Sequence, residues 1–79
     1  MSVQAYVLIQ TEVGKAVTVV ESIRSISGVA VAEDVTGPED VIVKAEAPTM
    51  DELGRLVVAK IQSVPGITRT LTGPVVNLG

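Results

Sequence analysis

The chain has 79 residues and a formal net charge of −3, and 47% of its residues are hydrophobic. It contains no cysteine, histidine or tryptophan, which excludes disulfides, thiolate or imidazole metal sites and nucleophile–histidine catalysis. Its six Lys and Arg residues are scattered, and no apolar run approaches a membrane span or a signal peptide. We therefore expect a soluble cytoplasmic protein with neither a nucleic-acid nor a membrane partner.

The first predicted strand, residues 3–10, is apolar on both faces. Val3, Ala5, Val7 and Ile9 alternate with Gln4, Tyr6, Leu8 and Gln10. A chain this short has room for one core, which rarely contributes more than ~3–5 kcal/mol unaided. With no covalent or metal cross-link, self-association is the remaining way to bury apolar surface. We expect Tyr6 and Leu8 to form a dimer interface.

Two amphipathic helices are predicted, one in each half of the chain. The first, residues 15–26, is indicated by Ala16, Val19, Val20, Ile23 and Ile26 at helical spacing. The second opens at a capping box, Thr49 to Glu52, and continues with Leu53, Val57 and Ile61 at four-residue intervals. Gly54 in its first turns lowers helix propensity, which predicts close contact with a strand or a neighbouring subunit there.

Between the helices, the sequence predicts a β-hairpin that turns at residues 36–39. Val29, Val31 and Val35 are expected to alternate with small or polar residues along the incoming strand, so that Val29 and Val31 share a face, and Val41, Val43 and Ala45 are expected to do the same along the outgoing strand. Four carboxylates surround the turn: Glu33, Asp34, Glu39 and Asp40. They carry no specific metal or acid–base signature, and a solvated acidic tip is the commoner explanation. Gly37 leaves backbone N–H groups accessible, and Asp40 is equally suited to accepting hydrogen bonds from a ligand ammonium or to ordering the turn.

The last predicted strand, residues 67–72, places Ile67, Arg69 and Leu71 opposite three threonines. Thr68, Thr70 and Thr72 would share a face that suits a partly wet surface or a polar ligand. The apolar tail, residues 74–78, is expected to lie along another subunit. Residues 25–29 (SISGV) are echoed by residues 63–67 (SVPGI), so the halves of the chain repeat. The pattern predicts an α+β, ferredoxin-like βαββαβ fold: a four-stranded antiparallel sheet with two helices on one face.

A known family shares these motifs. The turn Gly37-Pro38-Glu39-Asp40 and the strand VIVKA that follows it, with SISGV before and VPGITRT after, resemble the effector-binding RAM domain of the Lrp/AsnC, or leucine-responsive, regulators. The resemblance covers essentially the whole chain and implies one RAM-like domain over residues 1–79. It also implies dimers that stack their sheets, higher rings such as octamers, and an amino acid bound where dimers meet. The implied ligand-binding residues are Gly37, Asp40, Thr70 and Thr72, although turn geometry and strand propensity also explain them.

Full-length regulators of this family carry a helix-turn-helix that this sequence lacks, so the resemblance implies a stand-alone sensor. It would act on transcription or amino-acid metabolism indirectly, or co-assemble with full-length relatives. We expect no enzyme activity and no cofactor. The alternatives are a ligand-free structural or partner-binding oligomer, an ACT-like amino-acid-binding domain, and a small ferredoxin-like enzyme. A single tyrosine without histidine disfavours the enzyme.

Overall fold

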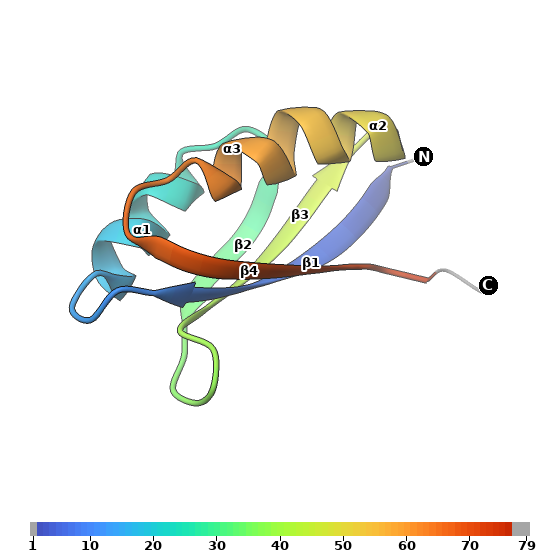
Figure 1. Cartoon of the computed structure of the whole chain (residues 1–79). Coiled ribbons are helices and arrows are strands. Elements are labelled where there is room, and N and C mark those ends of the chain that lie inside the picture. The colour runs from blue at the N-terminus through green and yellow to red at the C-terminus, as the bar shows by residue number, and fades with distance from the viewer. Residues whose placement is uncertain (1, 77–79) are drawn as a thin grey trace.

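The computed structural model describes residues 2–76, except for the side chain of Leu56. Four strands and two helices follow one another in the order βαββαβ, and the second helix is divided into three segments (Figure 1). The elements are β1 (Val3–Thr11), α1 (Ala16–Arg24), β2 (Val29–Asp34), β3 (Val41–Ala47), α2 (Met50–Glu52), the π-helical turn η1 (Leu53–Val58), α3 (Ala59–Gln62) and β4 (Ile67–Pro74).

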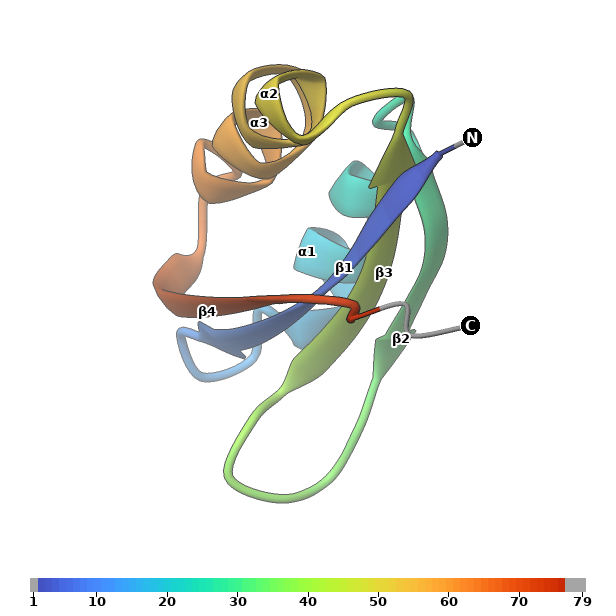
Figure 2. The same ribbon diagram turned by 90° about the vertical axis from the view of Figure 1, so that its right-hand side faces the viewer.

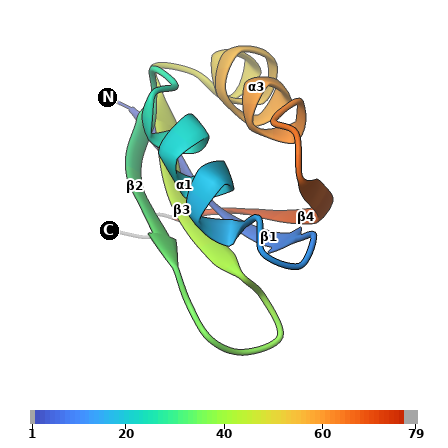
Figure 3. The ribbon, with the colours of Figure 1, turned by 90° about the vertical axis from the view of Figure 1, so that its left-hand side faces the viewer.

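The strands form an antiparallel sheet in the order β2-β3-β1-β4. Both helices lie on the same face of this sheet, and the loop between β2 and β3 projects beyond its end (Figure 2 and Figure 3). The predicted ferredoxin-like fold is confirmed. Within residues 2–76, no helix has the length and apolar character needed to cross a membrane.

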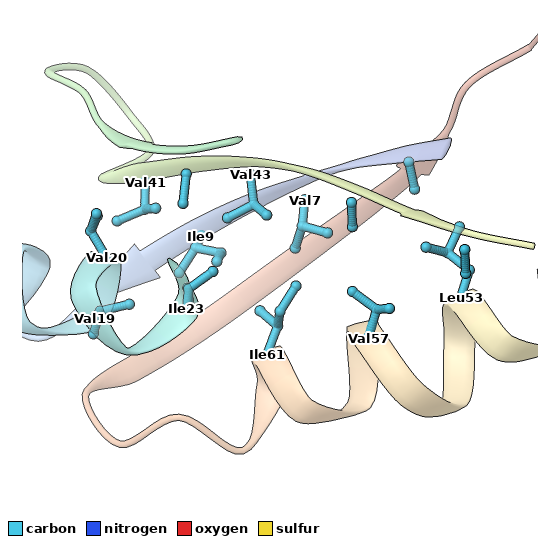
Figure 4. Close-up of a cluster of buried hydrophobic side chains, with 14 residues drawn as sticks. Val7, Ile9, Val19, Val20, Ile23, Val41, Val43, Leu53, Val57 and Ile61 are labelled. Carbon is cyan, nitrogen blue, oxygen red and sulfur yellow. The ribbon is translucent and has the colours of Figure 1, made fainter. Parts of the chain in front are cut away.

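The apolar core lies between the sheet and the helices. Figure 4 shows side chains of β1 and β3 pointing toward those of α1, η1 and α3. The periodicities that predicted the strands and helices are confirmed, because the inward-facing residues are those with apolar spacing. The buried residues are Ala5, Val7, Ile9, Ala32, Val41, Val43, Ala45 and Ala47 from the sheet, and Val19, Val20, Ile23, Leu53, Val57 and Ile61 from the helices.

The incoming strand of the hairpin departs from the prediction. Val29 pairs with Ala45 and packs against the core, whereas Val31 pairs with Lys44 and is 46% exposed on the opposite face. The prediction that Val29 and Val31 share a face is therefore wrong. The register shifts between them, as in a β-bulge, so that Ala32 rather than Val31 is the next buried residue of β2.

The second helix begins at the predicted capping box but is not a plain α-helix. The Glu52 N–H donates to Thr49 Oγ1 at 3.1 Å. Further along, the Ala59 N–H donates to the Gly54 carbonyl, five residues back, so one turn is wider than an α-turn. Residues four apart drift by ~40° around an α-helix. The wider turn reduces that drift and helps keep Leu53, Val57 and Ile61 facing the core.

Gly54 does not make the contact with a strand that the sequence suggested. Beyond the adjoining residues and the backbone of its own helix, no atom lies within 4 Å of the place where a Cβ would stand, and the residue is exposed. The expected packing against a strand is therefore wrong. A contact with a neighbouring subunit at Gly54 stays a prediction.

The internal sequence repeat has a structural counterpart. The Gly28 carbonyl accepts a hydrogen bond from the Glu46 N–H at 2.7 Å, and the Gly66 carbonyl accepts one from the Glu12 N–H at 2.8 Å. Each glycine follows a helix end and precedes an outer strand of the sheet. Each half of the chain thus donates one equivalent backbone hydrogen bond to the other half.

The last strand also contains a register shift. Ile67 pairs with Thr11 and packs against the core, whereas Leu71 pairs with Leu8 on the uncovered face of the sheet. The prediction that Ile67 shares a face with Arg69 and Leu71 is wrong, because the shift makes Thr68 an extra residue in β4. Of the tail, Val75 continues the pairing with β1, since its N–H donates to the Gln4 carbonyl at 2.9 Å. Residues 77 and 78 lie outside the described part of the chain.

Candidate functional site

The loop at residues 35–40 closes the hairpin and is fastened to the end of β1. The Val35 N–H donates to the Asp40 carbonyl at 2.9 Å, which closes the loop, and the Asp40 N–H donates to the Ile9 carbonyl at 2.8 Å. At the tip, Gln10 Nε2 donates to the Pro38 carbonyl at 3.1 Å. These bonds hold an exposed segment in one conformation, as a binding loop requires.

The tip of this loop presents unused backbone donors. Gly37 has a φ of 141°, which favours glycine, and no atom lies within 4 Å of the position of a Cβ. Within residues 2–76, no acceptor is recorded for the N–H groups of Thr36, Gly37 and Glu39. Exposed N–H groups of this kind can donate to a carboxylate.

Asp40 is partly buried, and its carboxylate already has a protein partner. Oδ2 accepts a hydrogen bond from the Thr11 N–H at 2.8 Å, at the point where the pairing of β1 with β4 shifts register. This contact orders the end of β1, which is the structural role that the sequence left open for Asp40. One hydrogen bond leaves a carboxylate with further acceptor positions, so an additional ligand contact is compatible with it.

The two threonines lie across β1 from the loop. Thr70 pairs with Ile9, the same residue whose carbonyl accepts the Asp40 N–H, but from the opposite side of β1. Two strand spacings therefore separate Asp40 from Thr70, roughly 10 Å. Thr72 pairs with Val7, two residues further from the loop. The chain brings Gly37 and Asp40 together, and it places Thr70 and Thr72 on a separate strand.

The threonine side chains face the helix layer, since their cross-strand partners Ile9 and Val7 point into the core. Gln62 Nε2 of α3 donates to Thr70 Oγ1 at 3.2 Å. Thr72 is exposed at the edge of the sheet. A role for both threonines in ligand binding stays a prediction.

The face of the sheet opposite the helices carries the predicted dimer-interface residues. Tyr6 is 46% exposed, Leu71 is 54% exposed, and Leu8 and Ile42, which pair with each other across β1 and β3, are half-buried. Lys44 Nζ lies 5.9 Å from the centre of the Tyr6 ring. Apolar side chains from neighbouring strands thus form a continuous surface that helices do not cover, here called the outer sheet face.

The acidic residues around the hairpin do not gather into a metal site. Within residues 2–76, no group of three or more carboxylates is arranged to hold a metal ion. The contact of Gln10 with the loop was not predicted. The alternation of residues in β1 indicated only that Gln10 lies on the outer face of the strand. Its amide fixes the Pro38 carbonyl. A long-range contact between a strand and a loop has no local sequence signal.

Comparison with known proteins identifies relatives over nearly the whole chain. Residues 4–77 match the family model described as the Lrp/AsnC ligand binding domain. An uncharacterized HTH-type transcriptional regulator of Pyrococcus furiosus is 32% identical over 71 residues, which cover 86% of this chain and 47% of that protein. The chain thus spans about half the length of this curated relative.

Solved structures share the fold. The crystal structure of FFRP-DM1 superposes with a TM-score of 0.86 at 34% identity, covering 94% of this chain and 99% of that one. A transcriptional regulator of Neisseria meningitidis superposes with a TM-score of 0.80 at 19% identity, covering 96% of this chain and 51% of that one.

Proposed function

Because the chain belongs to the Lrp/AsnC ligand-binding domain family, we propose that it is an oligomeric module that binds an amino acid as its effector. The observation that carries the proposal is the loop at residues 35–40. It is fastened to β1 at both Pro38 and Asp40, and it presents unused N–H groups beside a carboxylate. An amino acid needs donors for its carboxylate and an acceptor for its ammonium group, and this loop offers both.

In this proposal the ligand's ammonium group contacts Asp40, and its carboxylate contacts the amides near Gly37. The site is exposed, and two hollows elsewhere on the described part of the chain, one beside β2 and one at the end of β3, are not lined by Gly37, Asp40, Thr70 or Thr72. A second dimer would supply the missing wall. Thr70 lies across β1 from Asp40, so one small ligand would not contact both residues of the same chain. Hydroxyl contacts to a ligand at Asp40 would come from a threonine of a neighbouring copy.

A site completed between dimers couples ligand binding to assembly. A ligand that contacts two dimers stabilises the larger ring, such as an octamer, by its difference in affinity for the ring and the free dimer. The outer sheet face, with Tyr6 and Leu8, would pair two chains into the dimer. The solved N. meningitidis regulator of the same fold is a complex with L-Met, which supports an amino acid as the class of ligand.

The effect on transcription is a further step of the proposal. The matched relative is about twice as long and is described as an HTH-type regulator, so the ligand-binding half would influence gene expression through full-length relatives or through its own ring. The family is regulatory rather than enzymatic, and the proposal assigns no reaction to the chain.

A second candidate is a ligand-free oligomerisation module. The contact between Asp40 and the Thr11 N–H supports it, because this bond gives the aspartate a structural role that needs no ligand. Both candidates predict an oligomer, and only the first predicts saturable binding.

Titration calorimetry against the twenty amino acids, with the molecular mass measured by light scattering in the same samples, separates the two. We expect one amino acid or a related group to bind and to raise the mass. Asp40→Asn keeps an acceptor for the Thr11 N–H but removes the charge, so it should weaken ligand binding at least tenfold while the protein stays folded. Glu33→Gln is the matched control on the same hairpin. Absence of binding by every amino acid, or equal binding by Asp40→Asn, would refute the ligand site.

A further inference from the structure

A hollow of about 280 Å³ is lined by the turn before β2, the end of β3 and the second helix, which lie at the end of the molecule away from the 35–40 loop (Figure 3). Its walls are the turn at Ser27 and Gly28, the end of β3 at Glu46 and Ala47, and the second helix at Glu52, Val57 and Lys60. This volume is slightly below the ~300 Å³ at which pockets for drug-sized ligands begin, so it suits a small metabolite. We call this space the helix-end hollow.

The walls of the helix-end hollow are rigid. Gly28 has a φ of 99°, and a Cβ there would lie 2.5 Å from Val57 Cγ2, so the backbone and the helix are in close contact. The Gly28 carbonyl is also bonded to the Glu46 N–H at 2.7 Å. Val57 belongs to the π-helical turn, and such turns occur frequently at functional sites. The hollow is therefore formed by the ends of regular elements, in advance of any ligand.

Two opposite charges border this hollow and come from the same helix. Glu52 and Lys60 are eight positions apart, which is about 12 Å along a helix. Within residues 2–76 they form no ion pair with each other or with another side chain, although the Glu52 carboxylate accepts a long hydrogen bond from Thr49 Oγ1 at 3.5 Å, which leaves it further acceptor positions. Glu46 contributes its main chain, since its carboxylate accepts a hydrogen bond from Gln4 Nε2 on the outer sheet face. The charges that face a ligand are thus one carboxylate and one ammonium group, set apart.

We propose that the helix-end hollow is a second ligand site, contained within one chain, for a short linear molecule with an ammonium group at one end and a carboxylate at the other. The ammonium group would contact Glu52 and the carboxylate would contact Lys60. A dipeptide or an ω-amino acid, whose charged groups lie several bonds apart, matches this backbone spacing better than an α-amino acid, which has both groups on one carbon. The site is independent of the 35–40 loop, and the proposal does not depend on an effector bound there.

The test uses 6-aminohexanoate and diglycine as probes, with glycine as the short comparison, followed by backbone-amide NMR and calorimetry on the whole chain. We expect saturable shifts at Gly28, Ala47 and Lys60 for the two longer probes. Glu52→Gln and Lys60→Gln should each weaken binding about tenfold, as expected when one charged partner is lost. The controls Asp51→Asn and Arg55→Gln remove charges on the same helix that pair with each other at 2.7 Å, and they should have no effect.

A variant with exchanged charges, Glu52→Lys with Lys60→Glu, should regain binding because the ligand can bind in the reverse orientation. If this double variant binds, loss of the fold cannot explain the weaker binding of the two single variants. The proposal is overturned if no saturable shift occurs at Gly28 and Ala47, if hexylamine or hexanoate binds as tightly as 6-aminohexanoate, or if the controls weaken binding equally. Asp40→Asn should leave this binding unchanged, so failure here and failure of the loop site are distinguishable.

Discussion

Replacing Gly28 by alanine tests a close approach between the two halves of the molecule. At a φ of 99°, an added Cβ costs about 1–2 kcal/mol of backbone strain. The same Cβ would lie 2.5 Å from Val57 Cγ2 and 3.0 Å from the Glu46 carbonyl oxygen. Val57 is buried and β-branched, so it has few other rotamers, and relieving such overpacking costs about 1–3 kcal/mol more. We expect Gly28→Ala to lower the free energy of unfolding by about 2–5 kcal/mol.

Gly66→Ala is the matched control. Gly66 has nearly the same φ, 96°, but the nearest atoms to its added Cβ are Lys15 Cβ and Val19 Cγ2, each at 3.2 Å. Its backbone cost should equal that of Gly28, and its steric cost should be smaller by at least about 1 kcal/mol. Urea denaturation of both variants, at one protein concentration because assembly adds to stability, gives the comparison. If Gly28→Ala is no less stable than Gly66→Ala, the close packing of Gly28 on Val57 does not limit the fold.

Three other substitutions test the sheet face, the helix cap and the core. Leu8→Asp places a charge on the outer sheet face and should convert the proposed oligomer to smaller species in sedimentation velocity. Val17→Asp, on the exposed side of α1, should not, and equal effects would contradict a sheet-to-sheet dimer. Thr49→Ala removes the oxygen that accepts the Glu52 N–H and should cost about 1 kcal/mol in urea denaturation, with Ser in its place retaining most of the stability. Ile61→Ala, at a fully buried position, should cost about 2–5 kcal/mol, and a loss below that of Thr49→Ala would contradict its place in the core.

The sequence predicts the fold well because buried residues recur at the spacing of each element, every second residue in a strand and every third or fourth in a helix. Val7 and Ile9 on β1, or Leu53 and Ile61 on the second helix, are buried as their spacing requires. The errors occur where one residue is added to that spacing. The shifts near Val31 and Thr68 depend on the partner strand, and a single strand read alone contains no sign of them.

The candidate site is less predictable, because its residues meet only in three dimensions. Gly37 and Asp40 are three positions apart in one turn, and sequence could associate them. The bond from Gln10 to Pro38 joins residues 28 positions apart, and the bond from Thr11 to Asp40 joins residues 29 apart. The helix-end hollow likewise combines the first turn after α1 with the second helix. Nothing local to Ser27 or Lys60 indicates that they line one space.

The internal repeat explains why both candidate sites lie where they do. Gly28 and Gly66 make equivalent bonds to the opposite half of the chain, so each half supports the other, and a change at either glycine alters the framework. The 35–40 loop joins the two halves. Its residues 36–38 (TGP) recur in the sequence as residues 72–74, but those lie in strand β4, so the loop has no structural counterpart and its tip is free to change without loss of core contacts. The π-helical turn is likewise found in the second helix and not in α1. Both candidate sites therefore occur where the halves differ, and those are the positions at which a ligand specificity can change while the fold is kept.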